Sequence, residues 1–375
     1  MTSEWHEVSL RELVGYMSKG IAPSYAEEAS ETTIRVLNQK CNRNFRISYV
    51  ESRLHDTLKK KVPPERYVKP DDILINSTGA GTAGRIAQIE DVPSATTIDG
   101  HMILIRSNGK VTQKFLGYAL KSHQWEVLQL DEGSTGQTEL NRDRLLDEIM
   151  INYPVSFDEQ NAIVGTLESI DRKLVVNEQL NDNLQQQAQA IYSSMFIDNP
   201  DPAWSHGHLS DLITVKYGKD HKKLADGIYP VYGSGGIMRY VERPLYNEES
   251  VLIPRKGTLN NVMYVNQPFW SVDTMFYTEM KLPNVAKFVY HFVKAKDLAS
   301  MNAGSAVPSM TTDILNAMEV VIPSASALEE FESLVAPMYE AMEANDVQSK
   351  ALSQMRDTLL PKLMSGEIDV SDVQL

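Results

Sequence analysis

The sequence contains only one cysteine, Cys41, among its 375 residues. A single thiol cannot form a disulfide within the chain, and this scarcity of cysteine favours a reducing compartment. There is no Cys-x-x-Cys pair and no Cys/His cluster. The pair His206 and His208 has no third candidate ligand nearby, so we expect no metal site.

A long hydrophobic run is also missing. No stretch approaches the roughly 18 uninterrupted apolar residues that a membrane-spanning helix needs. The segment Met1–Leu10 carries Glu4 and Glu7 where a signal peptide has an apolar core. We therefore expect a cytoplasmic protein without membrane contact. The length, with 42% hydrophobic and 23% charged residues, is typical of two globular domains.

Positive charge is scarce, because the formal net charge is −14. Duplex DNA repels an acidic surface, so this charge argues against nucleic-acid binding. The acidity is concentrated, however: residues 156–199 hold seven acidic and two basic side chains, and residues 324–375 hold ten and three. The rest of the chain is nearly neutral and can form local basic patches.

What the sequence does contain is an internal repeat. Its second half repeats, in order, a tryptophan followed by two leucines, an apolar run ahead of a glycine, an apolar residue before an aspartate, a small polar turn, and a proline ahead of a long helix. The matched landmarks are Trp5, Leu10 and Leu13 with Trp204, Leu209 and Leu212; Ile73–Ile75 and Gly79 with Val251–Ile253 and Gly257; Ile98–Asp99 with Val272–Asp273; Gly133–Gly136 with Gly304–Ala306; and Pro154 with Pro323.

The first copy is longer by about 29 residues, which we place within Ser30–Arg66. Short runs of Val, Ile and Tyr between Gly, Pro and Asn predict strands, and helical stretches are expected near Phe115–Leu128 and Val285–Lys296. These patterns predict α+β domains related by a pseudo-two-fold repeat.

Each proline is followed by a predicted capping box, Ser156 with Glu159 and Ser326 with Glu329. Apolar residues then recur at spacings of three and four, with polar residues in the middle, which is typical of a coiled-coil seam whose polar members set the register. We expect the two helices to pair as an antiparallel coiled coil, each roughly 55 to 60 Å long. The alternative that each helix packs only on its own domain stays open. The predicted seam residues are Leu167, Ile170, Leu174, Asn177, Asn181, Leu184, Ile191, Met338, Asn345, Leu352, Met355 and Leu359.

The second half carries the most typical phrases of a known family. They are Ile228–Gly236, Val251–Thr258, Trp270–Asp273 and Leu359–Ile368. In this order, and with the duplicated helices, the chain resembles the DNA specificity subunits of type I restriction-modification enzymes over nearly its whole length. The predicted domains are a first target-recognition domain (1–155), a central spacer helix (156–199), a second target-recognition domain (200–323), and a C-terminal spacer helix with tail (324–375).

The resemblance implies that each globular domain reads one half of a split target in double-stranded DNA, while the helices hold the halves at a fixed distance. It also implies docking of two methyltransferase subunits and, in full assemblies, two restriction subunits. S-adenosylmethionine, ATP and Mg would then be bound by those partners. This chain has no Asn-Pro-Pro-aromatic motif, the nearest being Asn199–Pro202, and no Gly-x-x-x-x-Gly-Lys-Ser/Thr loop, so we expect a non-catalytic subunit without a cofactor.

Gly79, Gly81 and Gly84 spell the Gly-x-Gly-x-x-Gly pattern of a dinucleotide site. Because Arg85–Pro93 is predicted to be another strand instead of a helix, we interpret the glycines as a hairpin tip. Small residues let backbone N–H groups reach phosphates, and arginine can grip guanine. The candidate DNA-binding residues are Thr78, Gly79, Arg85, Ser134, Thr135, Gln137, Lys216, Lys219, Lys222, Lys223, Tyr232, Ser234, Arg255 and Lys256.

Two other functions stay open at this stage. The globular domains could bind proteins, which would make the chain a two-headed scaffold without salt-sensitive DNA affinity. The chain could also be a nuclease or methyltransferase, which its own turnover would reveal. The basic and polar candidates could likewise be ordinary solvated loop residues.

Overall fold

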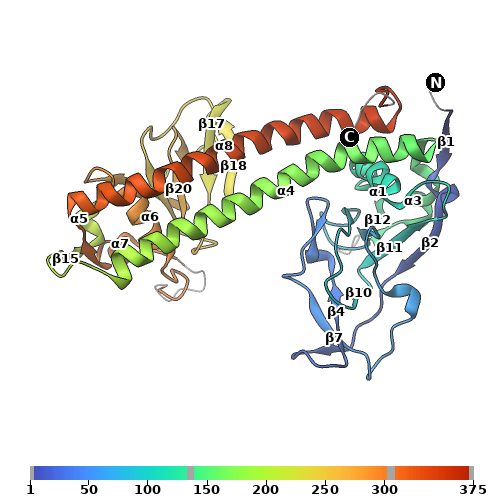
Figure 1. Ribbon diagram of the computed structural model, residues 1–375, viewed down its shortest axis with the longest axis horizontal. Helices are drawn as coiled ribbons and strands as arrows, with labels where there is room; N and C mark the ends of the chain where they lie inside the picture. Colours follow the sequence, from blue (N-terminus) through green and yellow to red (C-terminus); the bar gives the residue numbers. More distant parts are fainter. Residues whose placement is uncertain (1–3, 133–138, 302–308, 371–375) are drawn as a thin grey trace. The chain divides into compact units, whose positions relative to one another are not determined.

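The computed structural model describes residues 4–132, 139–301 and 309–370 (Figure 1). The chain divides into two compact units: unit 1 contains Met1–Val176 and Gln348–Leu375, and unit 2 contains Asn177–Val347. The division falls inside both long helices, α4 (Phe157–Ser193) and α8 (Ala325–Met364). Each unit therefore includes a segment of each long helix.

Unit 1 is built on two four-stranded sheets and a strand pair. The first sheet, in the order β2-β11-β8-β9, is antiparallel throughout. In the second, of order β10-β4-β7-β3, the pair β10 and β4 is parallel. The strands are β2 (Val14–Lys19), β11 (Met102–Ser107), β8 (Ile73–Asn76), β9 (Ile86–Gln88), β10 (Thr96–Ile98), β4 (Thr33–Leu37), β7 (Arg53–Asp56), β3 (Tyr25–Ala26), and the separate pair β1 (Trp5–Ser9) and β14 (Met150–Pro154).

Unit 2 has the same plan with fewer strands. Its sheet of order β16-β22-β19-β20 corresponds to the first sheet of unit 1, and its sheet of order β18-β17-β21 contains the matching parallel pair, β17 and β21. The elements are β15 (Ser205–His208) paired with β23 (Glu319–Ile322), β16 (Ile213–Tyr217), β22 (Met275–Met280), β19 (Ser250–Pro254), β20 (Met263–Val265), β18 (Gly236–Val241), β17 (Asp226–Gly233) and β21 (Trp270–Ser271). This shared topology confirms the predicted repeat and the α+β class.

Some of the additional residues of unit 1 form a hairpin that unit 2 lacks among its described residues. Strands β5 (Asn42–Arg43) and β6 (Arg46–Ile47) lie between β4 and β7. Their turn residues, Asn44 and Phe45, both have positive φ, at 53° and 61°, as the mirror-image turn of a two-residue hairpin requires. In unit 2 the corresponding strands β17 and β18 are joined directly through Ser234 and Gly235. The hairpin lies inside the segment where the extra residues were predicted.

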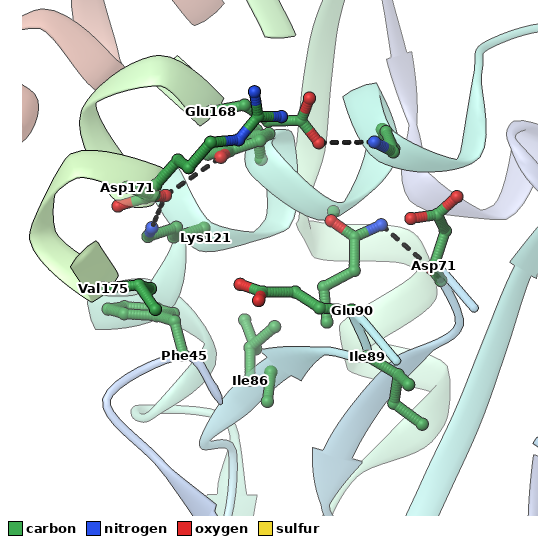
Figure 2. Close-up of a pocket in the computed structure, with 15 residues that line it drawn as sticks. Phe45, Asp71, Ile86, Ile89, Glu90, Lys121, Glu168, Asp171 and Val175 are labelled. Carbon is green, nitrogen blue, oxygen red and sulfur yellow. Dashed lines mark hydrogen bonds and ion pairs between the residues drawn. The ribbon is translucent and has the colours of Figure 1, made fainter. Parts of the chain in front are cut away.

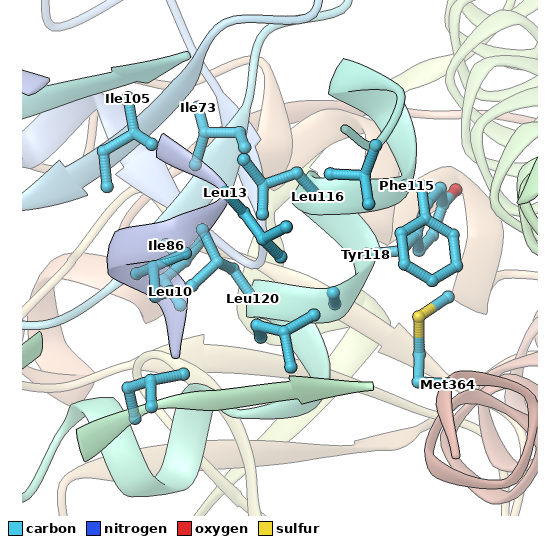
Figure 3. Close-up of a cluster of buried hydrophobic side chains, with 14 of the residues drawn as sticks. Leu10, Leu13, Ile73, Ile86, Ile105, Phe115, Leu116, Tyr118, Leu120 and Met364 are labelled. Atoms are coloured by element: carbon cyan, nitrogen blue, oxygen red, sulfur yellow. The ribbon is translucent and has the colours of Figure 1, made fainter. Parts of the chain in front are cut away.

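The repeated landmarks form the core of each unit because their side chains meet behind the antiparallel sheet. In unit 1, Leu10 and Leu13 pack with the buried strand β8 and with helix α1 (Gln113–Ser122), as Figure 3 shows. Met364, near the end of α8, closes the same cluster. In unit 2, Leu209 and Leu212 take the same place against β19 and helix α6 (Ala286–Lys294). Both helices were predicted near these positions.

Within each unit the segments of α4 and α8 lie side by side and run antiparallel (Figure 1). In unit 1, Arg356 of α8 pairs with Asp171 of α4 at 3.2 Å. In unit 2, Asn345 of α8 donates to the Oδ1 of Asn181 of α4 at 2.8 Å, and Asn181 Nδ2 donates to Asp346 at 2.8 Å. These contacts confirm the predicted coiled coil and its polar centre.

The two helices begin differently. At α4 the serine half of the predicted capping box forms, because the Glu159 N–H donates to the Ser156 hydroxyl at 3.4 Å. The Glu159 carboxylate accepts from the indole N–H of Trp5 at 3.1 Å. The prediction for α8 was wrong by two residues. The helix begins at Ala325, and its capping residue is Ser324. The Ser324 hydroxyl accepts from the N–H of Ala327 at 3.3 Å. Strand β23 ends at Ile322, so only Pro323 and the capping residue Ser324 separate the strand from the helix.

Candidate nucleic-acid interface

The loop 77–85 of unit 1 joins two antiparallel strands, β8 and β9. A strand and not a helix follows the glycines, so the hairpin-tip interpretation is confirmed and no dinucleotide site is formed. Gly79, Gly81 and Gly84 have φ values of 111°, 68° and 84°, a region that side chains disfavour and glycine tolerates. The pattern of glycines therefore reflects the tight turn.

Two of the predicted candidates have defined partners in this loop. The Thr78 hydroxyl bonds to Nδ1 of His101 at 2.8 Å. The guanidinium of Arg85 donates to the carbonyl of Gly81 at 3.2 Å, and the side chain is half-buried. Arg85 therefore lies along its own loop, and the loop supports the guanidinium.

The equivalent loop of unit 2, residues 255–262, joins β19 to β20. Lys256 is exposed there. Arg255 lies over the ring of Tyr217, with 5.4 Å from its Cζ to the ring centroid, and it donates to the carbonyl of Asp273 at 3.3 Å. The ring and the carbonyl orient the guanidinium.

Ser234, at the tip of the β17–β18 hairpin, is brought to the same loop. Its carbonyl accepts from Asn261 Nδ2 at 2.8 Å. Gly257 has a φ of 85°, and a Cβ at that position would lie 2.6 Å from the Ser234 hydroxyl oxygen. The structure thus gathers Ser234, Arg255 and Lys256, which the sequence separates by about 20 residues.

The two loops begin with an equivalent backbone hydrogen bond, called here the loop frame, but they carry different side chains. In unit 1 the N–H of Ser77 donates to the His101 carbonyl at 2.8 Å. In unit 2 the N–H of Arg255 donates to the Thr274 carbonyl at 2.9 Å. Arg255 is therefore the equivalent of Ser77, and Lys256 is the equivalent of Thr78. The frame repeats while the chemistry at its tip changes.

The four lysine candidates of unit 2 lie in β16 and directly after it. Lys216 belongs to the strand and pairs with Glu279 at 3.3 Å, so its charge is partly used within the unit. Lys219, Lys222 and Lys223 are exposed. The Lys219 carbonyl accepts from the indole N–H of Trp270 at 2.8 Å, which anchors the start of this stretch to β21.

Other candidates are placed differently. Tyr232 is buried in a second hydrophobic cluster of unit 2, with Phe269 and Trp270, and its hydroxyl accepts from Gln267. A ring held in the core is not available to stack on a base. Ser134, Thr135 and Gln137 lie outside the described residues. Which of the candidates bind DNA stays a prediction.

Sequence reasoning missed His101 and Asn261, which shape the two loops. His101 lies 23 positions from Thr78, and Asn261 lies 27 from Ser234. The predicted match of Asp99 with Asp273 was wrong by one residue: the N–H of Asp99 donates to Leu37, and in unit 2 the equivalent bond runs from Val272 to Tyr232. Burial raises the pKa of the Asp99 carboxyl, which accepts from the His101 N–H at 2.9 Å.

The predicted seam residues are buried or half-buried with one exception. Leu167, Ile170 and Asn177 are buried. Leu174, Asn181, Leu184, Ile191, Met338, Asn345, Leu352 and Leu359 are half-buried. Met355 differs from the prediction: it is 52% exposed. The inward position is taken by its neighbour Arg356, whose guanidinium reaches Asp171, so an ion pair interrupts the apolar spacing.

A pocket of about 290 Å³ lies in unit 1 where α1 and β9 face α4 (Figure 2). Ile86, Ile89 and Phe45 supply apolar walls. Lys121 donates to Asp171 at 2.9 Å. Burial lowers the pKa of Lys121. Burial acts to raise the pKa of Asp171, but the charge and hydrogen bond of Lys121 hold it below its usual value.

Within the described ranges, no group of three or more His, Cys, Asp or Glu side chains could hold a metal ion. None of the helices in the part of the chain that the structure describes has the length and apolar character to cross a membrane.

Comparison with known proteins identifies relatives of both repeats. A family model described as the type I restriction modification DNA specificity domain matches residues 2–186 and 203–331. The chain is 25% identical over 323 residues to the type I restriction enzyme MjaIX specificity subunit of Methanocaldococcus jannaschii. The aligned region covers 74% of this chain and 74% of that one. It is 33% identical over 92 residues to the HindI specificity subunit of Haemophilus influenzae, covering 24% of this chain and 18% of that one.

The fold also matches a solved structure. The crystal structure of a type I restriction-modification system S subunit from M. genitalium aligns with a TM-score of 0.60 at 18% identity, covering 97% of this chain and 99% of the other. At this identity the match concerns the fold alone.

Proposed function

The chain belongs to the type I restriction modification DNA specificity family, and from this premise we propose how its two units divide the work. Each unit reads one half of a bipartite target in double-stranded DNA, and the chain supplies sequence recognition to a complex whose chemistry is carried out elsewhere. The observation that carries this proposal is the loop frame shared by both units, with Ser77-Thr78-Gly79 in one and Arg255-Lys256-Gly257 in the other. Two loops held in the same way but carrying different side chains can read two different half-sites of one DNA target.

The chemistry of the loops supports direct reading of DNA in unit 2. Arg255 offers a planar guanidinium that can donate two hydrogen bonds to guanine in the major groove. Its contacts with Tyr217 and Asp273 reduce the freedom lost on binding. Lys256, Lys219, Lys222 and Lys223 are exposed cations that suit phosphate contacts. Lys216 is the weaker candidate because Glu279 already pairs with it.

Unit 1 has a less basic tip, which offers a hydroxyl, an imidazole and backbone groups where unit 2 offers Arg255 and Lys256. Thr78 and His101 present a hydroxyl bonded to an imidazole, and Gly79 exposes backbone beside them. Such groups can donate to and accept from base edges. We therefore expect the loop of unit 1 to contribute less to the salt dependence of DNA binding than the loop of unit 2.

The helices α4 and α8 serve as the spacer in this proposal, and their helix length sets the number of base pairs between the half-sites. Their acidic surface is unsuited to DNA and suits partner subunits. The partners would be two methyltransferase subunits and, for cleavage, two restriction subunits. S-adenosylmethionine, ATP and Mg would be bound by those partners, and the chain itself would have no catalytic turnover.

A genome-wide map of methylated adenine tests the proposal. The native host is compared with the same strain lacking this gene, and with that strain expressing either the intact chain or an Arg255→Ala variant. Loss of methylation at one split motif, its return with the intact chain, and a changed base preference in one half of the motif with the variant are the expected results. A map that does not change on removing the gene, in a host with an active methyltransferase, would contradict DNA specificity and favour a protein scaffold.

A matched control separates recognition from folding. Arg243 is an exposed arginine just beyond β18, at the end of the β17–β18 hairpin opposite Ser234. Arg243→Ala removes the same charge away from the 255–262 loop, and the motif should keep both halves. If Arg243→Ala changes the motif as Arg255→Ala does, the loop assignment is wrong.

A further inference from the structure

The segment of unit 1 in which the additional residues lie has a charge opposite to that of the chain. Ser30–Arg66 contains nine basic and four acidic side chains, a net charge of +5 in a chain whose net charge is −14. Positive charge gathered in one segment of an acidic protein is typical of a surface that binds an anionic partner. The structure shows which of these cations are free for such a partner.

Several cations of this segment are already used within unit 1. Lys59 pairs with Asp56 at 3.6 Å, and the ammonium of Lys60 donates to a backbone carbonyl at 2.8 Å. Lys40 and Arg43 differ from them. Both side chains are exposed, and neither forms an ion pair with a carboxylate among the described residues. These two charges are therefore available to a partner.

The two residues lie on elements that are bonded to the loop 77–85. Lys40 belongs to the short 3-10 helix η2 (Gln39–Cys41), and Arg43 ends β5. Between them, the buried Asn42 donates through Nδ2 to the Arg85 carbonyl at 2.8 Å and to Oδ1 of Asn76 at 3.2 Å. Asn76, the last residue of β8, donates in turn to the carbonyl of Gln39 at 3.2 Å. The two buried asparagines thus hold η2 and β5 against both ends of the loop.

The side chains on either side of this connection fix which way the hairpin faces. Gln39 reaches the tip of the loop, because a Cβ at Gly79 would lie 2.7 Å from its Oε1. Phe45, at the hairpin turn, is half-buried against the core of unit 1 and lines the pocket shown in Figure 2. The hairpin therefore turns its aromatic residue toward the core, while Lys40 and Arg43 remain in solvent beside the loop.

Unit 2 has its exposed lysines at a different place in the same fold. Gly20 of unit 1 and Gly218 of unit 2 are equivalent, because their N–H groups donate to the carbonyls of Met102 and Met275, each at 3.1 Å. Residues 21–26, after the first glycine, carry no charge. The exposed lysines after the second glycine are Lys219, Lys222 and Lys223. Unit 1 therefore has no cations where unit 2 has three, and it has the basic hairpin instead.

We propose that η2 and β5 form a phosphate-binding site of unit 1, in which Lys40 and Arg43 contact the DNA backbone beside the half-site that the loop 77–85 reads. This inference rests on the proposed function, since it assumes that unit 1 binds DNA. An exposed ammonium and guanidinium suit phosphate oxygens, and such contacts position a protein on the duplex without reading bases. DNA is favoured over an acidic protein because the asparagines that hold the hairpin also hold the reading loop. The hairpin has no counterpart among the described residues of unit 2, so the contact belongs to one half-site only.

Ethylation interference tests the site. The full chain is bound to a duplex that carries the split motif from the methylation map and one ethylated phosphate per molecule. Phosphates whose ethylation prevents binding are located for the intact chain, Lys40→Ala and Arg43→Ala. Binding constants for the motif and for a scrambled duplex are measured at several salt concentrations.

The control is Lys110→Ala, which removes one exposed lysine from the same unit. Lys110 follows β11, and the other end of that strand, Met102, pairs with Asn76 beside the loop 77–85. The control charge therefore lies at the opposite end of the sheet. Two further variants, Lys40→Arg and Arg43→Lys, keep the positive charge.

We expect ethylation to interfere at phosphates beside the half-site of unit 1, which is the half that Arg255→Ala leaves unchanged. Lys40→Ala and Arg43→Ala should each remove the interference at one phosphate and lower the slope of the logarithm of the binding constant against log salt by about one. Each should weaken binding to the motif and to the scrambled duplex by the same factor. Lys110→Ala should change neither quantity, and the two charge-keeping variants should retain the interference.

Alanine variants of Lys40 and Arg43 that behave like Lys110→Ala would overturn the phosphate site and leave the proposed function intact. An equal loss of salt slope in all three would also overturn it, because it would reveal an effect of total charge. A changed base preference would show a base contact and overturn it as well. Failure of the intact chain to prefer the motif over the scrambled duplex would instead overturn the proposed function.

Discussion

His291 makes the stability of unit 2 depend on pH in a way that can be calculated. The ring is fully buried on α6. Its Nδ1 lies 2.8 Å from the Gln189 carbonyl oxygen of α4, and its Nε2 lies 2.9 Å from the Tyr339 hydroxyl of α8. Gln189 Oε1 can only accept, so Nδ1 carries the proton and Nε2 accepts from the tyrosine. Burial and the charge of Lys294 lower the pKa of His291 to about 4.

The neutral imidazole is therefore favoured in the folded protein, while the unfolded chain protonates near the ordinary value of 6.5. The contribution of neutral His291 to the free energy of unfolding is complete above about pH 6.5. It is lost as the pH falls from there toward 4, because only the unfolded state binds the proton in that window. The full shift corresponds to about 3 kcal/mol, and about 2 kcal/mol is lost by pH 5. Below about pH 4 both states bind the proton and the loss stops growing.

The assay is urea denaturation of the intact chain and a His291→Gln variant between pH 7.5 and pH 5, followed by tryptophan fluorescence. Glutamine keeps hydrogen-bonding groups without titrating, so the difference between the two free energies of unfolding isolates the histidine. We expect the intact chain to lose about 2 kcal/mol more than the variant over this range. Parallel pH profiles, or an NMR titration of His291 near 6.5, would refute the reasoning.

Three further predictions concern DNA. Arg255→Ala should weaken binding by about 1 to 3 kcal/mol and relax the preference at one base of a single half-site, as measured by competition with single-base variants of the target. Lys222→Ala should lower the slope of the logarithm of the DNA-binding constant against log salt by about one without changing base preference. The control variant Lys294→Ala, on α6, should change neither quantity. An altered base preference for Lys222→Ala would contradict a phosphate contact. Removing seven residues from each of α4 and α8 should shorten the spacer of the methylated motif and keep both half-sites, and new half-site bases would count against the spacer role.

The internal repeat was predictable because it depends on buried apolar residues at short spacings. Leu10 and Leu13, and their counterparts Leu209 and Leu212, are all fully buried. Such positions tolerate few alternatives, so the pattern survives in both halves. The same reasoning located the helices α1 and α6, which pack on those leucines.

The ends and the polar details of the long helices were less predictable. Ser324 and Ser326 both suit a cap by sequence, and only the position of the preceding strand makes Ser324 the residue whose hydroxyl is used. Met355 fits an apolar spacing as well as any seam residue does. It is exposed because Asp171 of the opposite helix selects Arg356 for the inward position, which no local pattern reports.

By itself the sequence determined the repeat, the α+β class, the paired helices and the family, because these follow from periodic burial and from phrases that lie next to each other in the chain. The tertiary structure alone decided which residues share a surface. It brought Ser234 to Asn261, His101 to Thr78, and Lys287 between Tyr264 and Tyr339. Such groupings join residues from separate strands and helices, and the distances between them depend on how the elements pack, which no single stretch of sequence encodes.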